Sequence, residues 1–181
     1  MTVSFTLFDT AIGRCAIAWG ARGVAGVQLP EANESKTRAR VLKRFPRAKE
    51  AAPPSEVACA RDSIIALLRG EPGDLSSVLL DMDLVPRFHR RVYEDARSIP
   101  QGVTMTYGAL AARIGAAGSA RAVGQALARN PFAIIVPCHR VVAAGGRIGG
   151  FSANGGVLTK SRLLAIERHE QGAPERAVHR A

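Results

Sequence analysis

The chain has 181 residues, 47% of them hydrophobic, and a formal net charge of +10. This length and composition predict one large globular domain or two small ones, and they exclude a mainly disordered chain. The sequence contains neither a signal-peptide pattern nor a run of about 18 apolar residues, so we expect a cytoplasmic protein without a membrane segment.

The positive charge is concentrated in the second half of the chain. Residues 1–85 carry 11 Lys and Arg against 10 Asp and Glu, whereas residues 86–181 carry 14 against 5. A basic half of this kind attracts polyanions, and nucleic acid is the usual partner. A solvated basic surface without a partner is the alternative.

Three cysteines, Cys15, Cys59 and Cys138, lie far apart in the sequence. They form no CxxC pair, and no histidine stands at the spacing of a zinc finger. This pattern is typical of a reducing compartment and argues against a cysteine-based zinc site. We expect neither a metal ion nor a cofactor.

The first half of the chain predicts a small sheet with two helices. Alternating apolar residues predict an antiparallel meander with strands over residues 3–8, 15–19 and 24–29. Helical patterns follow over residues 33–45 and 55–69, the second with Ser55 as a possible N-cap and Gly70 at its end. Residues 78–84 predict a further strand or an extended linker. We therefore expect an N-terminal α/β domain over residues 1–84.

The second half predicts a mainly helical domain over residues 85–170, followed by a flexible tail over residues 171–181. A helix is expected to begin at Pro86 and to end at Pro100. Two short helices, about 107–114 and 120–129, are joined by a glycine-containing turn, with Ser119 placed to cap the second.

The two short helices have a helix-turn-helix pattern. The second would present Arg121, Gln125 and Arg129 outward and pack Val123, Ala126 and Leu127 inward. Helix pairs with glycine turns are also common in protein cores, so the pattern alone is weak. The basic character of this half favours contact with DNA.

The stretch around Cys138 carries the candidate chemistry. An apolar run of strand character, Ile134 to Val136, is stopped by a proline, and His139 follows the thiol directly. Glu167 lies in a helical pattern near the end of this half. These residue types suit a Cys-His-Glu relay, in which the thiol acts as thiolate. A buried cysteine with a purely structural role is the alternative.

A family resemblance rests on these residues. The run Ile134 to Val142, with Pro137-Cys138-His139-Arg140-Val141 at its centre, resembles the active-site signature of the O6-alkylguanine-DNA alkyltransferases, a highly specific motif. The similarity covers about residues 84–168, and the N-terminal half matches only in its layout. It extends through Ile99 to Gly108, Arg121 to Gly124, Asn130-Pro131, a glycine-rich loop, Leu163-Leu164 and Glu167.

The resemblance implies a role for each matching residue. Cys138 would accept the alkyl group, His139 would remove its proton through a water, Glu167 would orient His139, and Asn130 would brace the active-site turn. Further implied contacts to the flipped nucleotide involve Tyr107, Arg121, the carbonyl of Val141, Lys160, and either Ser152 or Asn154. DNA contacts would come from Ala120, Arg121, Gln125 and Arg129.

The sequence and the resemblance together predict a mixed α/β (α+β) protein that repairs O6-alkylguanine by irreversible transfer to Cys138, with O4-alkylthymine as a second candidate substrate. The expected partner is double-stranded DNA without sequence preference, bound by a monomer. Two rivals remain: a Cys-His-Glu hydrolase of esters or amides, and a helix-turn-helix regulator or lesion-sensing binder without chemistry. The first leaves the basic half unexplained, and the second leaves Cys138 without a role.

Overall fold

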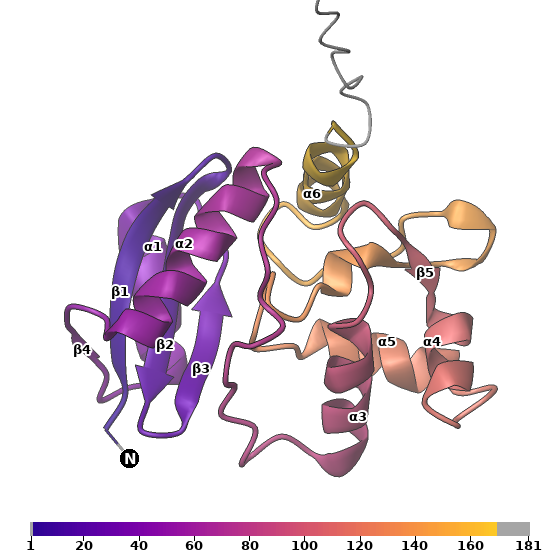
Figure 1. Ribbon diagram of the computed structural model, residues 1–181, viewed down its shortest axis with the longest axis horizontal. Coiled ribbons are helices and arrows are strands. Elements are labelled where there is room, and N and C mark those ends of the chain that lie inside the picture. Colours follow the sequence, from indigo (N-terminus) through magenta and orange to yellow (C-terminus); the bar gives the residue numbers. More distant parts are fainter. Residues whose placement is uncertain (1, 170–181) are drawn as a thin grey trace, which may run out of the picture.

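The computed structural model describes residues 2–169, and the tail predicted over residues 171–181 lies outside the described residues. A sheet with one helix on each face forms the N-terminal half, and a group of helices forms the C-terminal half beside it (Figure 1). This arrangement confirms the predicted mixed α/β fold. The boundary between residues 84 and 85 stays a prediction.

The N-terminal sheet is the predicted meander with one added strand. Its strand order is β3-β2-β1-β4; β1 to β3 pair antiparallel, and β4 pairs parallel with β1. The strands are β1 (Ser4–Thr10), β2 (Gly13–Gly20), β3 (Gly23–Gln28) and β4 (Lys49–Glu50). The two-residue β4 carries too little pattern to be recognised in the sequence.

Alternation along β2 divides the apolar residues between two faces of the sheet. Cys15, Ile17 and Trp19 belong to the main core, whereas Ala16 and Ala18 belong to a smaller core under the first helix. This division follows from the two-residue period of a strand. The sheet is therefore buried on both faces by helices.

The two helices of this half begin differently. Helix α1 (Glu34–Arg44) is capped by Asn33, whose side chain accepts a hydrogen bond from the backbone of Lys36. Helix α2 (Ser55–Arg69) has Pro54 as its N-cap, so the prediction that Ser55 caps it is wrong. The preceding proline already fixes an extended backbone there, and Ser55 becomes the first helical residue. Gly70 ends α2 in a left-handed conformation, as predicted.

The C-terminal half contains four helices, two short strands and two 3-10 turns within the described residues. They are α3 (Arg87–Ala96), β5 (Met105–Thr106), α4 (Tyr107–Arg113), α5 (Ala120–Ala128), the 3-10 turns Cys138–Arg140 and Ala144–Gly146, β6 (Val141–Val142) and α6 (Val157–His169). Helix α3 stops at Ala96, before the predicted end at Pro100, because residues 97–99 continue as hydrogen-bonded turns.

The two halves meet along the outer edge of β3. Residues 78–81 run extended with a single bridge to Val24, whose backbone pairs with Leu79 and Asp81, and residues 82–85 form a hydrogen-bonded turn. Further along, the Val27 N–H donates to the Pro131 carbonyl at 2.8 Å. The main hydrophobic core includes residues of both halves. The sheet edge is thus covered by the segment that leads toward Cys138.

Within residues 2–169, no helix combines the length and the apolar character that crossing a bilayer requires.

Candidate active site

The approach to Cys138 is a buried turn, so the predicted strand over Ile134 to Val136 is wrong. Ile134 has a φ of 72°, a left-handed conformation that is unfavourable for a β-branched residue. Asn130 holds this turn: its Nδ2 donates to the Val136 carbonyl and its Oδ1 accepts from the Phe132 N–H, both at 2.9 Å. The side-chain amide therefore stabilises a turn where the sequence pattern predicts a strand.

Cys138 opens a 3-10 turn, and its side chain is only partly buried. Burial raises the pKa of the thiol, while a hydrogen bond with Asn130 and the charge of Lys160 act in the opposite direction. At neutral pH the group is therefore mainly a thiol. A neighbouring base is needed to remove its proton.

His139 and Glu167 form a buried pair, 1% and 5% exposed respectively. The His139 Nε2 lies 2.8 Å from the Glu167 Oε1, and the buried Nδ1 has no hydrogen-bond partner among residues 2–169. Burial lowers the pKa of His139 against the opposing effect of Glu167, so the ring is neutral at neutral pH. With Nε2–H donated to the carboxylate, Nδ1 carries a lone pair that can accept a proton.

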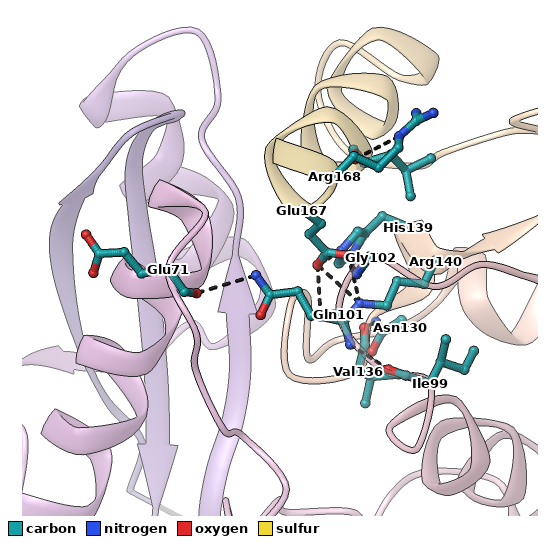
Figure 2. Close-up of polar contacts among 11 residues, drawn as sticks. Glu71, Ile99, Gln101, Gly102, Asn130, Val136, His139, Arg140, Glu167 and Arg168 are labelled. Carbon is teal, nitrogen blue, oxygen red and sulfur yellow. Dashed lines mark hydrogen bonds and ion pairs between the residues drawn. The ribbon is translucent and has the colours of Figure 1, made fainter. Parts of the chain in front are cut away.

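Arg140 is the site residue that the sequence analysis did not assign. Its guanidinium donates to both carboxylate oxygens of Glu167 at 2.8 to 3.1 Å and to the Ile99 carbonyl at 2.6 Å (Figure 2). The Gly102 N–H adds a third donor to Glu167, at 3.2 Å. Burial alone would raise the pKa of Glu167, but hydrogen bonds from His139 and Arg140 lower it to about 2. The signal available in the sequence was an arginine two residues after the thiol, at the end of an apolar run, because a charge that is buried there needs a partner.

A pocket of about 540 Å³, here called the base pocket, connects the second helix of the helix-turn-helix to Cys138. Its lining consists of Tyr107, Ala120, Arg121, Gly124, Gln125, Leu127, Ala128, Cys138, Gly150, Phe151 and Ser152. The thiol and five of the predicted substrate or DNA contacts, Tyr107, Ala120, Arg121, Gln125 and Ser152, therefore share one cavity.

Lys160 lies at the edge of this site and is fully buried. Its Nζ donates to the Val141 carbonyl at 2.5 Å and to the Tyr107 hydroxyl oxygen at 3.3 Å. Burial lowers the pKa of Lys160, although the charge of a Cys138 thiolate would raise it. One ammonium group thus connects two residues that the sequence analysis assigned to nucleotide binding.

The two candidate residues of the glycine-rich loop lie in different places. Ser152 lines the base pocket, whereas Asn154 does not. Asn154 is exposed, and its carbonyl accepts a hydrogen bond from the Thr159 hydroxyl at 2.6 Å, close to the start of α6. The loop therefore brings Ser152 toward Cys138 and turns away at Asn154.

Helix α5 shows the predicted division of its faces. Arg121, Gln125 and Arg129 are exposed, and the apolar residues Val123, Ala126 and Leu127 are buried. Ser119 is the N-cap residue but makes no side-chain hydrogen bond there, so its predicted capping interaction is absent. Arg129 lies at the C-terminal end of α5, outside the base pocket.

Within residues 2–169, no group of three or more His, Cys, Asp and Glu side chains is arranged to hold a metal ion.

Comparison with known proteins identifies the family. Residues 87–169 match the model of the 6-O-methylguanine DNA methyltransferase DNA-binding domain. A methylated-DNA–protein-cysteine methyltransferase from Methanothermobacter thermautotrophicus is 37% identical over 151 residues, which cover 83% of this chain and 77% of that protein. The chain belongs to the methylated-DNA–protein-cysteine methyltransferase family.

Other members of the family agree with this assignment. The methyltransferase of Mycobacterium leprae is 46% identical over 99 residues, or 54% of this chain and 59% of that protein. The structure of Mycobacterium tuberculosis OGT in complex with DNA aligns with a TM-score of 0.73 at 32% identity, covering 92% of this chain and 94% of the other. For the O6-methylguanine-DNA methyltransferase of Pyrococcus kodakaraensis, the TM-score is 0.69 at 28% identity, with 92% and 99% covered.

Proposed function

We propose that this methyltransferase repairs DNA by transferring an alkyl group from the O6 atom of guanine directly to the Sγ atom of Cys138. One observation carries the proposal: a partly exposed thiol lines a pocket that starts at the exposed helix of a helix-turn-helix. The next residue, His139, is neutral, and its Nδ1 has no hydrogen-bond partner within residues 2–169.

The chemistry is a single displacement. A bond forms between Sγ and the alkyl carbon while the bond between that carbon and O6 of guanine breaks, and the electron pair leaves with the base. The thiol proton passes through a water to the Nδ1 atom of His139, and Glu167 stabilises the imidazolium that results. The product is a thioether without a leaving group at neutral pH. Each protein molecule therefore repairs one lesion.

Tyr107 supplies the proton donor for the departing base. Its hydroxyl oxygen already accepts a hydrogen bond from Lys160, so its own hydrogen is available to guanine. The Val141 carbonyl accepts from Lys160 as well, and its second lone pair is available to the exocyclic amine of guanine. Ser152 is the loop residue proposed to contact O6, because its side chain borders the base pocket.

DNA binding places the target in this pocket. The O6 atom of a stacked guanine is out of reach of Cys138, so the nucleotide must leave the duplex. Arg121, exposed in the first turn of α5, is proposed to enter the stack in its place. We further propose that a monomer binds without sequence preference, since phosphate contacts carry no sequence information, and that it acts in the cytoplasm.

A stoichiometric titration tests the proposed function against its two rivals. A fixed amount of protein is mixed with increasing amounts of duplex containing O6-methylguanine, and repaired guanine is counted. Our proposal predicts a plateau at one repaired guanine per protein molecule. Continued turnover of a small ester would indicate a hydrolase, and tight binding without repair would indicate a lesion sensor.

A further inference from the structure

A second groove reaches Cys138 from the N-terminal half of the chain. This groove, here called the interdomain groove, has a volume of about 400 Å³. It lies between the last turn of α1, the face of β2 and β3 that α1 covers, the end of α5, and residues 151–153. Residues of both halves therefore form its walls.

The charged residues of the interdomain groove are almost all basic. Arg40, Lys43 and Arg44 come from α1, Arg129 comes from the end of α5, and Glu31 is the one acidic residue of the lining. Glu31 lies 3.9 Å from Arg40. Among residues 2–169, no ion pair or side-chain hydrogen bond neutralises Lys43, Arg44 or Arg129.

One α1 cation outside the groove, Arg38, is paired, unlike Lys43 and Arg44 in the groove. Arg38 forms ion pairs with both Glu34 and Glu50. In total, α1 carries five basic residues against one acidic residue, although residues 1–85 are nearly neutral as a whole.

The interdomain groove adjoins the base pocket. Five residues line both cavities: Leu127, Ala128, Cys138, Phe151 and Ser152. Arg121 at the start of α5 and Arg129 at its end are eight residues apart, or about 12 Å along a helix. A basic surface therefore extends from the helix proposed to enter DNA, past the thiol, to the last turn of α1.

We propose that the interdomain groove binds backbone phosphates of the DNA duplex whose flipped nucleotide occupies the base pocket. The argument is charge complementarity: unpaired Lys and Arg side chains suit phosphate oxygens, and arginine suits them in a bidentate geometry. The N-terminal half then takes part in DNA binding together with the helix-turn-helix. This inference rests on the proposed function, because it places the groove beside a bound duplex.

Salt-dependent binding of a lesion-free duplex tests the proposal. The variant Lys43→Gln/Arg44→Gln removes two groove cations, and Lys36→Gln/Arg47→Gln removes two cations from the same region outside the groove. Each phosphate contact contributes about 0.9 to the steepness with which the logarithm of the binding constant falls against the logarithm of salt concentration. The slope of the groove variant should therefore be shallower than that of wild type by about 1.8. The control variant should keep the wild-type slope. Thermal unfolding and transfer from free O6-methylguanine base should match wild type in both variants.

Several results would overturn the proposal. Equal slopes in wild type and both variants would show that the groove does not contact phosphates. Equal losses of slope in both variants would show that the overall charge of the protein, and not the groove, causes the effect. Altered sedimentation of the DNA-free groove variant, with an unchanged DNA slope, would assign the groove to a second copy of the chain. Methyl transfer by the wild-type protein is measured separately, so loss of the groove contact and failure of the proposed function are distinguishable.

Discussion

The Nε2 atom of His139 lies 2.8 Å from the Oε1 atom of Glu167, and this contact determines which ring nitrogen can act as a base. Because Nε2 carries the hydrogen that is donated to the carboxylate, Nδ1 is left with its lone pair. Both side chains are buried, so water does not compete for the pair.

The rate of methyl transfer should depend little on pH around neutrality. Burial lowers the pKa of His139 from its ordinary 6.5, so the base stays neutral until the pH falls below that value. Burial also raises the pKa of Cys138 above its ordinary 9.0, so the sulfur keeps its proton until the pH exceeds that value. Single-turnover rates should therefore be flat between about pH 6.5 and 9 and fall at lower pH. A rate that rises tenfold per pH unit across this range would indicate free thiolate and exclude His139 as the base.

Replacing Glu167 by glutamine should destabilise the fold in a pH-dependent way. The pKa of Glu167 falls from 4.5 to about 2 on folding, which corresponds to about 3 kcal/mol at neutral pH. Between these values the folded state binds fewer protons than the unfolded state. The stabilisation is therefore complete above about pH 4.5 and is lost as the pH falls to about 2.

Urea unfolding of wild type and Glu167→Gln over this pH range measures the effect. Glu50→Gln is the matched control, because it breaks an exposed pair with Arg38 and should cost less than about 1 kcal/mol. A difference between wild type and Glu167→Gln that stayed constant from neutral pH to pH 2 would show that the carboxylate charge is not the cause.

Arg121→Ala should slow repair of duplex DNA far more than reaction with free O6-methylguanine base. Flipping costs a few kcal/mol in the stacked duplex and nothing for the free base, so only the first reaction needs a residue in the vacated space. The control is Arg69→Ala, an exposed cation at the end of α2 that borders neither pocket. Equal losses on both substrates would assign Arg121 a structural role.

Ser152→Ala should reduce the single-turnover rate on methylated duplex more than Asn154→Ala. Ser152 borders both cavities beside Cys138, whereas Asn154 borders neither. Loss of one hydrogen-bond donor to an oxygen that gains charge costs about a hundredfold to a thousandfold in rate. The Asn154 variant serves as the control in the same loop. Wild-type rates for both variants would mean that backbone amides contact O6, and a larger loss for Asn154→Ala would reverse the assignment.

Patterns within short segments predicted much of the fold. Alternation identified β1 to β3, and the helix-turn-helix faces followed from the spacing of Val123, Ala126 and Leu127. The apolar run at Ile134 predicts a strand that does not form. β-Branched residues favour strands, but the Asn130 side chain holds this segment in a turn. Its hydrogen bonds to two backbone groups cannot be read from residue type alone.

Contacts between segments that are distant in the sequence could not be predicted at the site. Arg140 stands two residues after Cys138, but its partner Glu167 stands 27 residues away and on another element. The short strands β5 and β6 pair parallel across 36 residues, from Met105 to Val141, without any local pattern. The basic groove could not be predicted from the charge of residues 1–85. The net charge of this segment is nearly zero, because acidic residues elsewhere offset the cations of α1.

The most direct test of the account is peptide mass spectrometry after reaction with duplex DNA that contains O6-methylguanine. We predict one added methyl group, located on the peptide that carries Cys138, and none on the peptides with Cys15 or Cys59. Cys15 is buried with its pKa raised to about 12, and exposed Cys59 borders neither pocket. Cys138→Ala should bind the duplex and remain unmodified. A methyl group on Cys15 or Cys59, or repair by Cys138→Ala, would contradict the account.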